Sequence, residues 1–297
     1  MNGRYGLAVL FLCLSLCVSA AYGQGVCTMQ NLAGTYAFKS IGSSTIAGPG
    51  DGFHWKASYA PIAFVGWFTI NPDGSGEGSS WGIAGAVNFG LAPFPFYPTF
   101  TLNDNCTGTM EYAFGESILK EKFVVLDNGR EIRGVVMQTA IATGTWFTTA
   151  RRITSSCGQN KVHGLYLFEC SDLLPLSVVS PPPDNIFAGA FQIQMLISPG
   201  GDYSGRMVGK VGPITSDAFP TDPPGLGFPV SGKITVHNDC TAEGTLISPA
   251  EPSINMARGV FFDEGRQGYW LPLDNLFPDG TTSPTVYGYC SITLMDR

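Results

Sequence analysis

Few residues of this sequence combine side-chain types and spacings that suit catalysis. The three histidines, His54, His163 and His237, form no His-x-His or HExxH pattern, and no CxxC occurs. Zinc and iron sites need such clustered ligands, so we predict no metal and no cofactor. The chain also lacks a P-loop. It therefore carries no signature of a phosphate-binding loop.

Glu111 and Tyr112 are the candidates for acid–base chemistry. They lie in a segment where Met110, Tyr112 and Phe114 alternate with Glu111 and Ala113. Successive side chains of a strand point to opposite faces, so the two sets face opposite ways. A carboxylate inside a barrel would have a shifted pKa and would mark a site. If the aromatic face is inward, which is the simpler interpretation, Glu111 is solvated.

His54, Trp55 and Tyr59 are the candidates for ligand binding. They belong to a Gly- and Ser-rich stretch over residues 42–60, which we interpret as a long loop after the first strand. Loops held by a rigid scaffold commonly carry binding residues. The alternative is that Trp55 only covers an open barrel end.

These candidates belong to a unit that occurs twice in the chain. Cys27 is followed by Gly, Tyr and Phe at offsets of 7, 9 and 11 residues, and Cys157 is followed by the same residues at the same offsets. Four further matches follow in the same order: the Phe-x-Gly-x-Phe-x-Ile alternations from Phe64 and Phe187, the segments around Cys106 and Cys240, the turns at Asp127 and Asp263, and Gly144 with Gly288. Five matches in one order indicate a duplicated domain.

The repeat predicts the fold class. Strand candidates in the first copy lie near residues 34–40, 62–70, 76–88, 97–103, 108–114, 121–127, 130–139 and 143–150. Short strands at this spacing indicate a sandwich or a barrel, and we favour a barrel because closure removes edge strands. We therefore predict an all-β protein of two tandem antiparallel barrels of about eight strands each. The expected domains are 24–153 and 154–297, after a signal peptide at 1–23.

Six cysteines follow the expected signal peptide, and their places in the repeat predict their pairing. Equivalent positions in two copies should be bridged alike, which predicts Cys27–Cys106 and Cys157–Cys240. Cys170 and Cys290 remain, in the first and last strands of the second copy, which are neighbours in a closed barrel. We expect a third bridge there. The matching residues of the first copy are Ser40 and Trp146 by this alignment.

The N-terminus indicates export. Arg4 is the only charged residue before an apolar run from Leu7 to Val18, and small residues follow it, as in a signal peptide. The run is shorter than the roughly 20 residues of a membrane span, so we expect none. We predict a secreted protein, extracellular or periplasmic, in which disulfides form. The sequon at Asn105 would be glycosylated only in a eukaryotic secretory pathway.

The charge balance argues against one class of partner. The formal net charge is -7, and no basic cluster interrupts the acidic composition. A nucleic-acid binder needs cationic groups to neutralise phosphates, so we predict no nucleic-acid partner.

Each copy resembles exported β-rich domains common in bacterial genomes. The resemblance is carried by Leu32-Ala-Gly34-Thr-Tyr36-Ala-Phe38 and by Asn105-Cys106-Thr107-Gly108. The Gly-x-Tyr of the first strand is similar to the Gly-x-Trp that opens lipocalin barrels, with Tyr36 and Tyr166 in place of Trp. Allene oxide cyclases and dirigent proteins have similar barrels, which guide reactive intermediates largely by shape. These resemblances imply a lipocalin-like fold that holds a small molecule.

Three functions remain open from the sequence, and it does not decide whether the protein is an enzyme. The first is a binding protein for a small apolar or glycan-like ligand. The second is a cyclase or isomerase of the allene-oxide-cyclase or dirigent type, acting through Glu111 or Tyr112. The third is a structural or adhesion protein of a cell surface or matrix.

Overall fold

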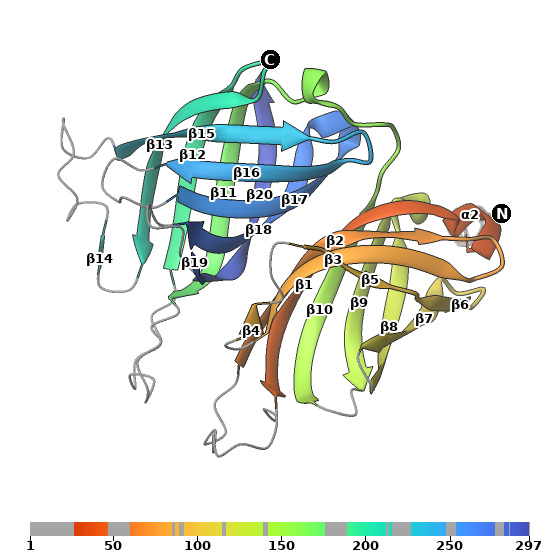
Figure 1. The fold of residues 1–297 in the computed structure, drawn as a ribbon. Coiled ribbons are helices and arrows are strands. Elements are labelled where there is room, and N and C mark those ends of the chain that lie inside the picture. Colours follow the sequence, from red (N-terminus) through yellow and green to blue (C-terminus); the bar gives the residue numbers. More distant parts are fainter. Residues whose placement is uncertain are drawn as a thin grey trace, which may run out of the picture.

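The computed structural model describes most of the chain after the expected signal peptide. The described ranges are 27–46, 60–84, 87–88, 92–114, 117–138, 142–175, 189–211, 214–215, 227–247, 254–276, 282–284 and 286–296. They form two antiparallel sheets, one from each copy of the repeat (Figure 1). The all-β prediction is confirmed. The signal peptide predicted at residues 1–23 lies outside these ranges.

The first sheet follows a short helix, α2 (Met29–Leu32). Its strands are β1 (Gly34–Ile46), β2 (Ala60–Ile70), β3 (Gly76–Ala84), β4 (Val87–Asn88), β5 (Phe94–Phe96), β6 (Thr99–Leu102), β7 (Thr107–Phe114), β8 (Ser117–Leu126), β9 (Glu131–Gln138) and β10 (Ala142–Arg152). Their order is β4-β3-β2-β1-β10-β9-β8-β7-β6, and β5 pairs with β3. The first strand therefore lies beside the last long strand, as a barrel-like sheet requires.

The second sheet begins after a short 3-10 helix, η2 (Gln159–Lys161). Its strands are β11 (Gly164–Pro175), β12 (Gly189–Ile197), β13 (Asp202–Val211), β14 (Ile214–Thr215), β15 (Phe228–Val236), β16 (Thr241–Ile247), β17 (Ile254–Phe262), β18 (Gln267–Leu276), β19 (Thr282–Pro284) and β20 (Val286–Asp296). Pairings of β12 with β13 and of β13 with β15 complete a ring of eight long strands. This copy is the closed antiparallel barrel that the sequence predicts.

The first copy differs from the predicted closed barrel, because its fourth strand is broken. β5 pairs only with β3, and β6 pairs with β7 and touches the β2–β3 turn through one bridge between Ser75 and Thr99. Pro98 lies between β5 and β6 and has no amide hydrogen to donate to a ladder. The equivalent residue of the second copy is Gly232, and there β15 runs unbroken between β13 and β16. The first copy is thus a curled sheet.

Matching hydrogen bonds define how the two copies superimpose. The hydroxyl of Tyr36 donates to the carbonyl of Gly129, and that of Tyr166 donates to the carbonyl of Gly265. The amide of Arg152 donates to the Arg130 carbonyl as that of Leu294 does to the Arg266 carbonyl. Even an irregularity in pairing recurs, between residues 120 and 121 in β8 and between residues 256 and 257 in β17. Equivalent positions can therefore be assigned strand by strand.

The three predicted cysteine pairs are disulfides in the structure: Cys27–Cys106, Cys157–Cys240 and Cys170–Cys290. The third joins β11 to β20, where Cys170 and Cys290 are register partners.

The predicted counterpart of Cys290 in the first copy is wrong by two residues. Ser40 pairs in register with Thr148 and not with Trp146. Matching Gly144 with Gly288 misplaced this strand, because the hydrogen bonds that Arg152 and Leu294 donate set its register.

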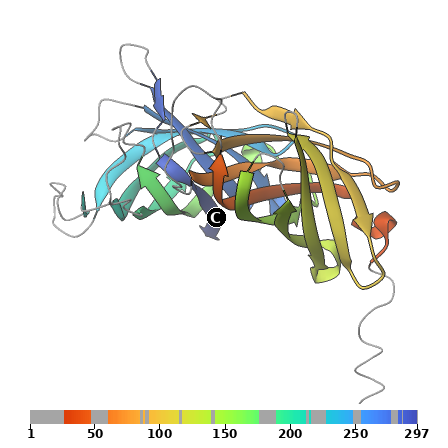
Figure 2. The ribbon, with the colours of Figure 1, turned by 90° about the horizontal axis from the view of Figure 1, so that it is seen from below.

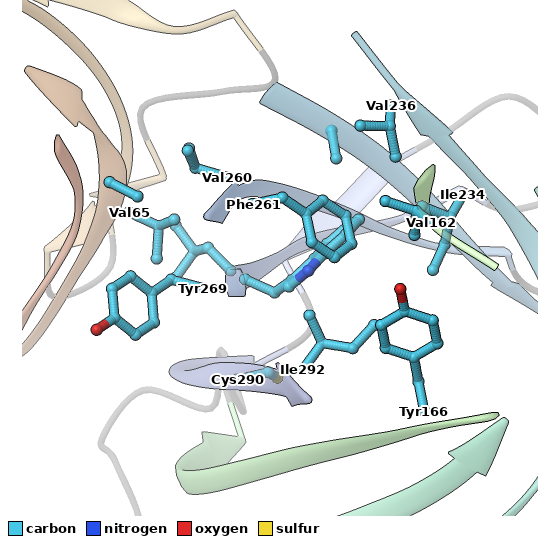
Figure 3. Close-up of a cluster of buried hydrophobic side chains, with 14 of the residues drawn as sticks. Val65, Val162, Tyr166, Ile234, Val236, Val260, Phe261, Tyr269, Cys290 and Ile292 are labelled. Atoms are coloured by element: carbon cyan, nitrogen blue, oxygen red, sulfur yellow. The ribbon is translucent and has the colours of Figure 1, made fainter. Parts of the chain in front are cut away.

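The two copies contact each other through the outer faces of β1–β3 and of β17, β18 and β20. Val65 of β2 lies beside Tyr269 of β18, with Val260 of β17 nearby (Figure 3). The curled sheets lie side by side when the molecule is turned by 90° (Figure 2). The contact explains why β2 of the first copy carries apolar residues on both faces.

A cation from the first copy also crosses this interface. Lys39 Nζ lies 3.9 Å from the ring centroid of Tyr289 and 5.2 Å from that of Tyr269. Beside it, the buried Glu131 carboxylate pairs with Arg151 at 2.7 Å. Burial raises the pKa of Tyr269 to about 12, although the neighbouring Arg151 opposes that rise.

Candidate functional site

Three of the predicted site residues lie outside the described ranges. His54, Trp55 and Tyr59 belong to residues 47–59, which connect β1 to β2. β1 ends at Ile46 and β2 begins at Ala60, at the end of the sheet opposite α2 (Figure 1).

The structure separates Glu111 from Tyr112. Glu111 faces outward and forms an ion pair with Lys120 of β8, with 2.5 Å between Nζ and Oε1. Tyr112 faces inward and packs with the buried side chains of the sheet, its ring centroid 5.4 Å from that of Phe96. Glu111 is therefore solvated, as the simpler interpretation expects, and only Tyr112 can meet a molecule inside the sheet.

The carboxyl group inside the first sheet comes from Glu121 of β8. Only 1% of this residue is exposed. Its side chain crosses the face of Gly134, where a Cβ atom would lie 1.8 Å from Glu121 Oε1. It reaches Thr148 of β10, whose hydroxyl donates a hydrogen bond to Oε2 over 3.1 Å. The missing side chain of Gly134 is therefore what allows a carboxyl group to lie there.

Two hydroxyl groups extend this polar cluster. Ser40 Oγ and Thr148 Oγ1 are 2.6 Å apart, and both residues are buried. A hydroxyl has one proton to donate. Since Thr148 donates to Glu121, Ser40 donates to Thr148, and the chain of hydrogen bonds runs from β1 through β10 to β8.

Burial governs the protonation of this cluster. Desolvation raises the pKa of Glu121 from an ordinary value of 4.5 to about 8, and the hydrogen bond from Thr148 only partly offsets the rise. Burial, with the Glu121 carboxylate next in importance, also raises the pKa of Tyr112 above its ordinary range. Glu121 is therefore mainly an uncharged carboxylic acid at neutral pH.

An apolar layer with one unpaired donor adjoins the carboxyl group. Trp146 of β10 is 5% exposed and packs with Ile62, Leu119 and Val136. Its indole N–H is buried and has no hydrogen-bond partner. Phe64 and Tyr112 contact this layer and also the aromatic core nearer α2. We call Glu121, Thr148, Ser40, Tyr112 and Trp146 the Glu121 cluster.

The second copy has none of this polar chemistry at the equivalent positions. Cys170 and Cys290 take the places of Ser40 and Thr148, and Ala257 takes the place of Glu121. The position of Gly134 is filled by Trp270, whose ring occupies the interior against Gly244 and Gly259. At these positions the second barrel therefore holds the Trp270 ring and a disulfide in place of polar groups.

Sequence reasoning missed Glu121, although a weak signal was present. Along β8, Leu119, Glu121, Phe123 and Val125 share one face, while Ile118, Val124 and Leu126 share the other with two lysines. Both faces contain apolar residues, so alternation alone does not show which is inward. The comparison of copies carries more information, because it places a carboxylate where the second copy has Ala257.

Two further findings concern the described part of the chain. No helix there is long and apolar enough to cross a membrane. No group of three or more His, Cys, Asp or Glu side chains within the same ranges is arranged to share a metal ion.

These observations define the class of the molecule as an all-β protein of two curled antiparallel sheets, one of them a closed barrel. No protein-family model matches the chain, and no curated protein matches it. It is similar to the crystal structure of a protein of unknown function from the DUF3598 family of Nostoc punctiforme. The identity is 9%, the TM-score is 0.25, and the match covers 91% of this chain and 98% of that one. A likeness this low supports no argument about family or function.

Proposed function

We propose that this is an exported, disulfide-stabilised protein that binds a small, largely apolar ligand inside its first copy. The observation that carries the proposal is the Glu121 cluster, in which buried polar groups lie within an interior of aromatic and aliphatic side chains. Ligand sites are typically apolar pockets with a few convergent polar groups, and perturbed pKa values gather at such sites.

The contrast between the copies supports this assignment. A fold that needed only stability would gain nothing from a buried carboxyl group, which is costly to desolvate. The second copy has the stable alternative of Trp270, Ala257 and a disulfide at the same positions. The polar cluster of the first copy is therefore best explained by a requirement other than folding.

Two further features fit the proposal. Eight-stranded antiparallel barrels of the lipocalin type hold single small ligands, and the broken fourth strand makes the first copy the less tightly closed of the two. Three disulfides are typical of proteins that work outside the cytosol.

Ligand screening tests the proposal directly. Protein exported from its expression host, with its disulfides formed, would be screened against lipid, terpenoid and sugar libraries by thermal shift. We expect apolar hits to raise the melting temperature of the wild type and of Glu111→Gln, a surface carboxylate control. The same hits should have less effect on Trp146→Phe. Absence of any shift across all three libraries would contradict the proposal.

A second candidate function is proton-transfer catalysis, such as an isomerisation or cyclisation. It is favoured by one observation, the pKa of about 8 for Glu121, because a general acid or base works best near the ambient pH. Product analysis with the hits from the screen tests it. Catalysis by Glu121 requires that Glu121→Gln still binds the compound and no longer converts it. Recovery of every bound compound unchanged would exclude catalysis on those compounds.

A further inference from the structure

We infer that the ligand of the first copy is an uncharged, mainly apolar molecule whose oxygen atom accepts hydrogen bonds from the Trp146 indole N–H and the Glu121 carboxyl group. The inference rests on the proposed function and specifies its ligand class. A ketone, an ether or an alcohol on a hydrocarbon skeleton has the required chemistry.

The first observation is the unpaired donor of Trp146. Its indole N–H is buried without a partner, and the residues packed around it are Ile62, Leu119 and Val136, whose side chains cannot accept a hydrogen bond. A buried donor that loses water without gaining a partner is destabilising. An acceptor atom supplied by a ligand would remove that penalty.

The second observation is the orientation of Glu121. Its Oε2 accepts the hydrogen bond from Thr148, which leaves Oε1 to carry the acid proton. None of the ion pairs in the described ranges includes Glu121, so no nearby cation favours the charged form. The carboxyl group therefore adds a second donor to the cluster.

Register places the two donors in one layer of the sheet. Val136 of β9 is the ladder partner of Glu121 and belongs to the same buried cluster as Trp146. One ligand atom that lies over Val136 is therefore within the region that both donors border.

The main competing ligand chemistry is an organic ammonium, for which Glu121 would act as a carboxylate. That arrangement leaves the Trp146 N–H unsatisfied, because an ammonium group is a donor and has no lone pair to accept with. It also requires a carboxylate in an apolar layer. The observed groups are better matched by an acceptor.

The second copy serves as an internal comparison. Trp270 also has an unpaired indole N–H, but no carboxyl group lies at the position of Glu121, and the ring fills the interior against Gly244 and Gly259. An unpaired indole is therefore not sufficient for a site. We expect one ligand per chain.

The test uses two skeletons, decane and menthane, each as hydrocarbon, ketone, alcohol and amine. Dissociation constants would be measured by calorimetry or fluorescence at slightly acid pH for the wild type, Trp146→Phe, Glu121→Gln, Glu121→Leu and the control Glu111→Gln. Circular dichroism and melting temperature would show whether each variant is folded.

The expected result is a preference for ketone or alcohol over hydrocarbon of about a hundredfold, about tenfold for each of the two hydrogen bonds. Trp146→Phe and Glu121→Leu should each weaken ketone binding by about tenfold. Glu121→Gln should keep most of it, because its amide N–H can donate. Glu111→Gln should have no effect.

Two results would overturn the inference while leaving the proposed function intact. One is a preference for the amine that Glu121→Gln abolishes, which would show that Glu121 binds as an anion. The other is equal binding of hydrocarbon and ketone, unaffected by the variants. If no compound of the series or of the wider libraries binds, the proposed function itself fails.

Discussion

The hydroxyl groups of Ser40 and Thr148 lie 2.6 Å apart at the register positions that Cys170 and Cys290 occupy in the second copy. The same two strand positions are thus joined by a hydrogen bond in one copy and by a disulfide in the other. In the first copy, the Thr148 hydroxyl also donates a hydrogen bond to Glu121. In the second copy, Ala257 takes the place of Glu121 and offers no polar side chain. At these positions, one copy of the repeat therefore has a disulfide and the other has a buried polar cluster.

The double variant Ser40→Cys/Thr148→Cys should form a fourth disulfide. The two residues are ladder partners 108 residues apart in sequence, and the corresponding pair in the second copy has a Cα–Cα distance of 4.0 Å. A bridge of that span stabilises by roughly 3–5 kcal/mol through restriction of the unfolded chain. Thiol counting and denaturant unfolding under non-reducing conditions measure the effect.

The matched control for that variant is Ser40→Ala/Thr148→Ala, which also lacks the hydroxyl groups and forms no bridge. We expect it to be less stable than the wild type. Two free thiols in the cysteine variant, with stability equal to the control, would contradict the assigned register.

Stability should fall as the pH rises through the neutral range, because of Glu121. Its pKa is about 8 in the folded protein and about 4.5 in an unfolded chain, so between these values the folded state holds a proton that the unfolded state has released. The loss of folding stability caused by Glu121 is absent below about pH 4.5, grows between about pH 4.5 and pH 8, and is constant above. Its limit is about 5 kcal/mol. Denaturant unfolding at several pH values measures it.

Glu121→Gln should remove most of this pH dependence, because the amide does not ionise and still accepts a hydrogen bond from Thr148. The variant should be more stable than the wild type above pH 8, and the difference in stability should be small near pH 5. A pH profile of Glu121→Gln identical to that of the wild type would show that other groups control it.

Gly134→Ala should destabilise the first copy by about 1–3 kcal/mol through overpacking. The added Cβ would lie 1.8 Å from Glu121 Oε1, so the carboxyl group must move away from Thr148. In a Glu121→Ala background, Gly134→Ala should lower the free energy of unfolding by much less. A double-mutant cycle measures this coupling, and additive effects would show that the two residues do not compete for space.

Trp270→Ala should cost about 3–5 kcal/mol, because the ring is 1% exposed and fills the second barrel. Denaturant unfolding measures the loss. Ligand binding by the first copy should be retained, which distinguishes a packing residue from a site residue. Lost binding in a folded Trp270→Ala protein would mean that the copies are coupled.

Much of this architecture could be predicted from the sequence, because its signals are local or repeated. Period-two alternation located most of the strands, and the offsets after Cys27 and Cys157 related the two copies. Equivalence between copies then predicted two of the cysteine pairs, and the adjacency of first and last strands in a barrel predicted the third. The broken fourth strand was also accessible in principle, since Pro98 stands where the second copy has Gly232.

The candidate site depended on tertiary structure. Both faces of β8 carry apolar side chains, so only the curl of the sheet decided that Glu121 points inward. Only the register of β10 made Thr148, and not Trp146, the partner of Ser40. The sequence by itself determined which strands and bridges form, because these follow from local pattern and repetition. Which polar side chains meet inside depends on the stagger between strands distant in sequence, and only the folded sheet determines that.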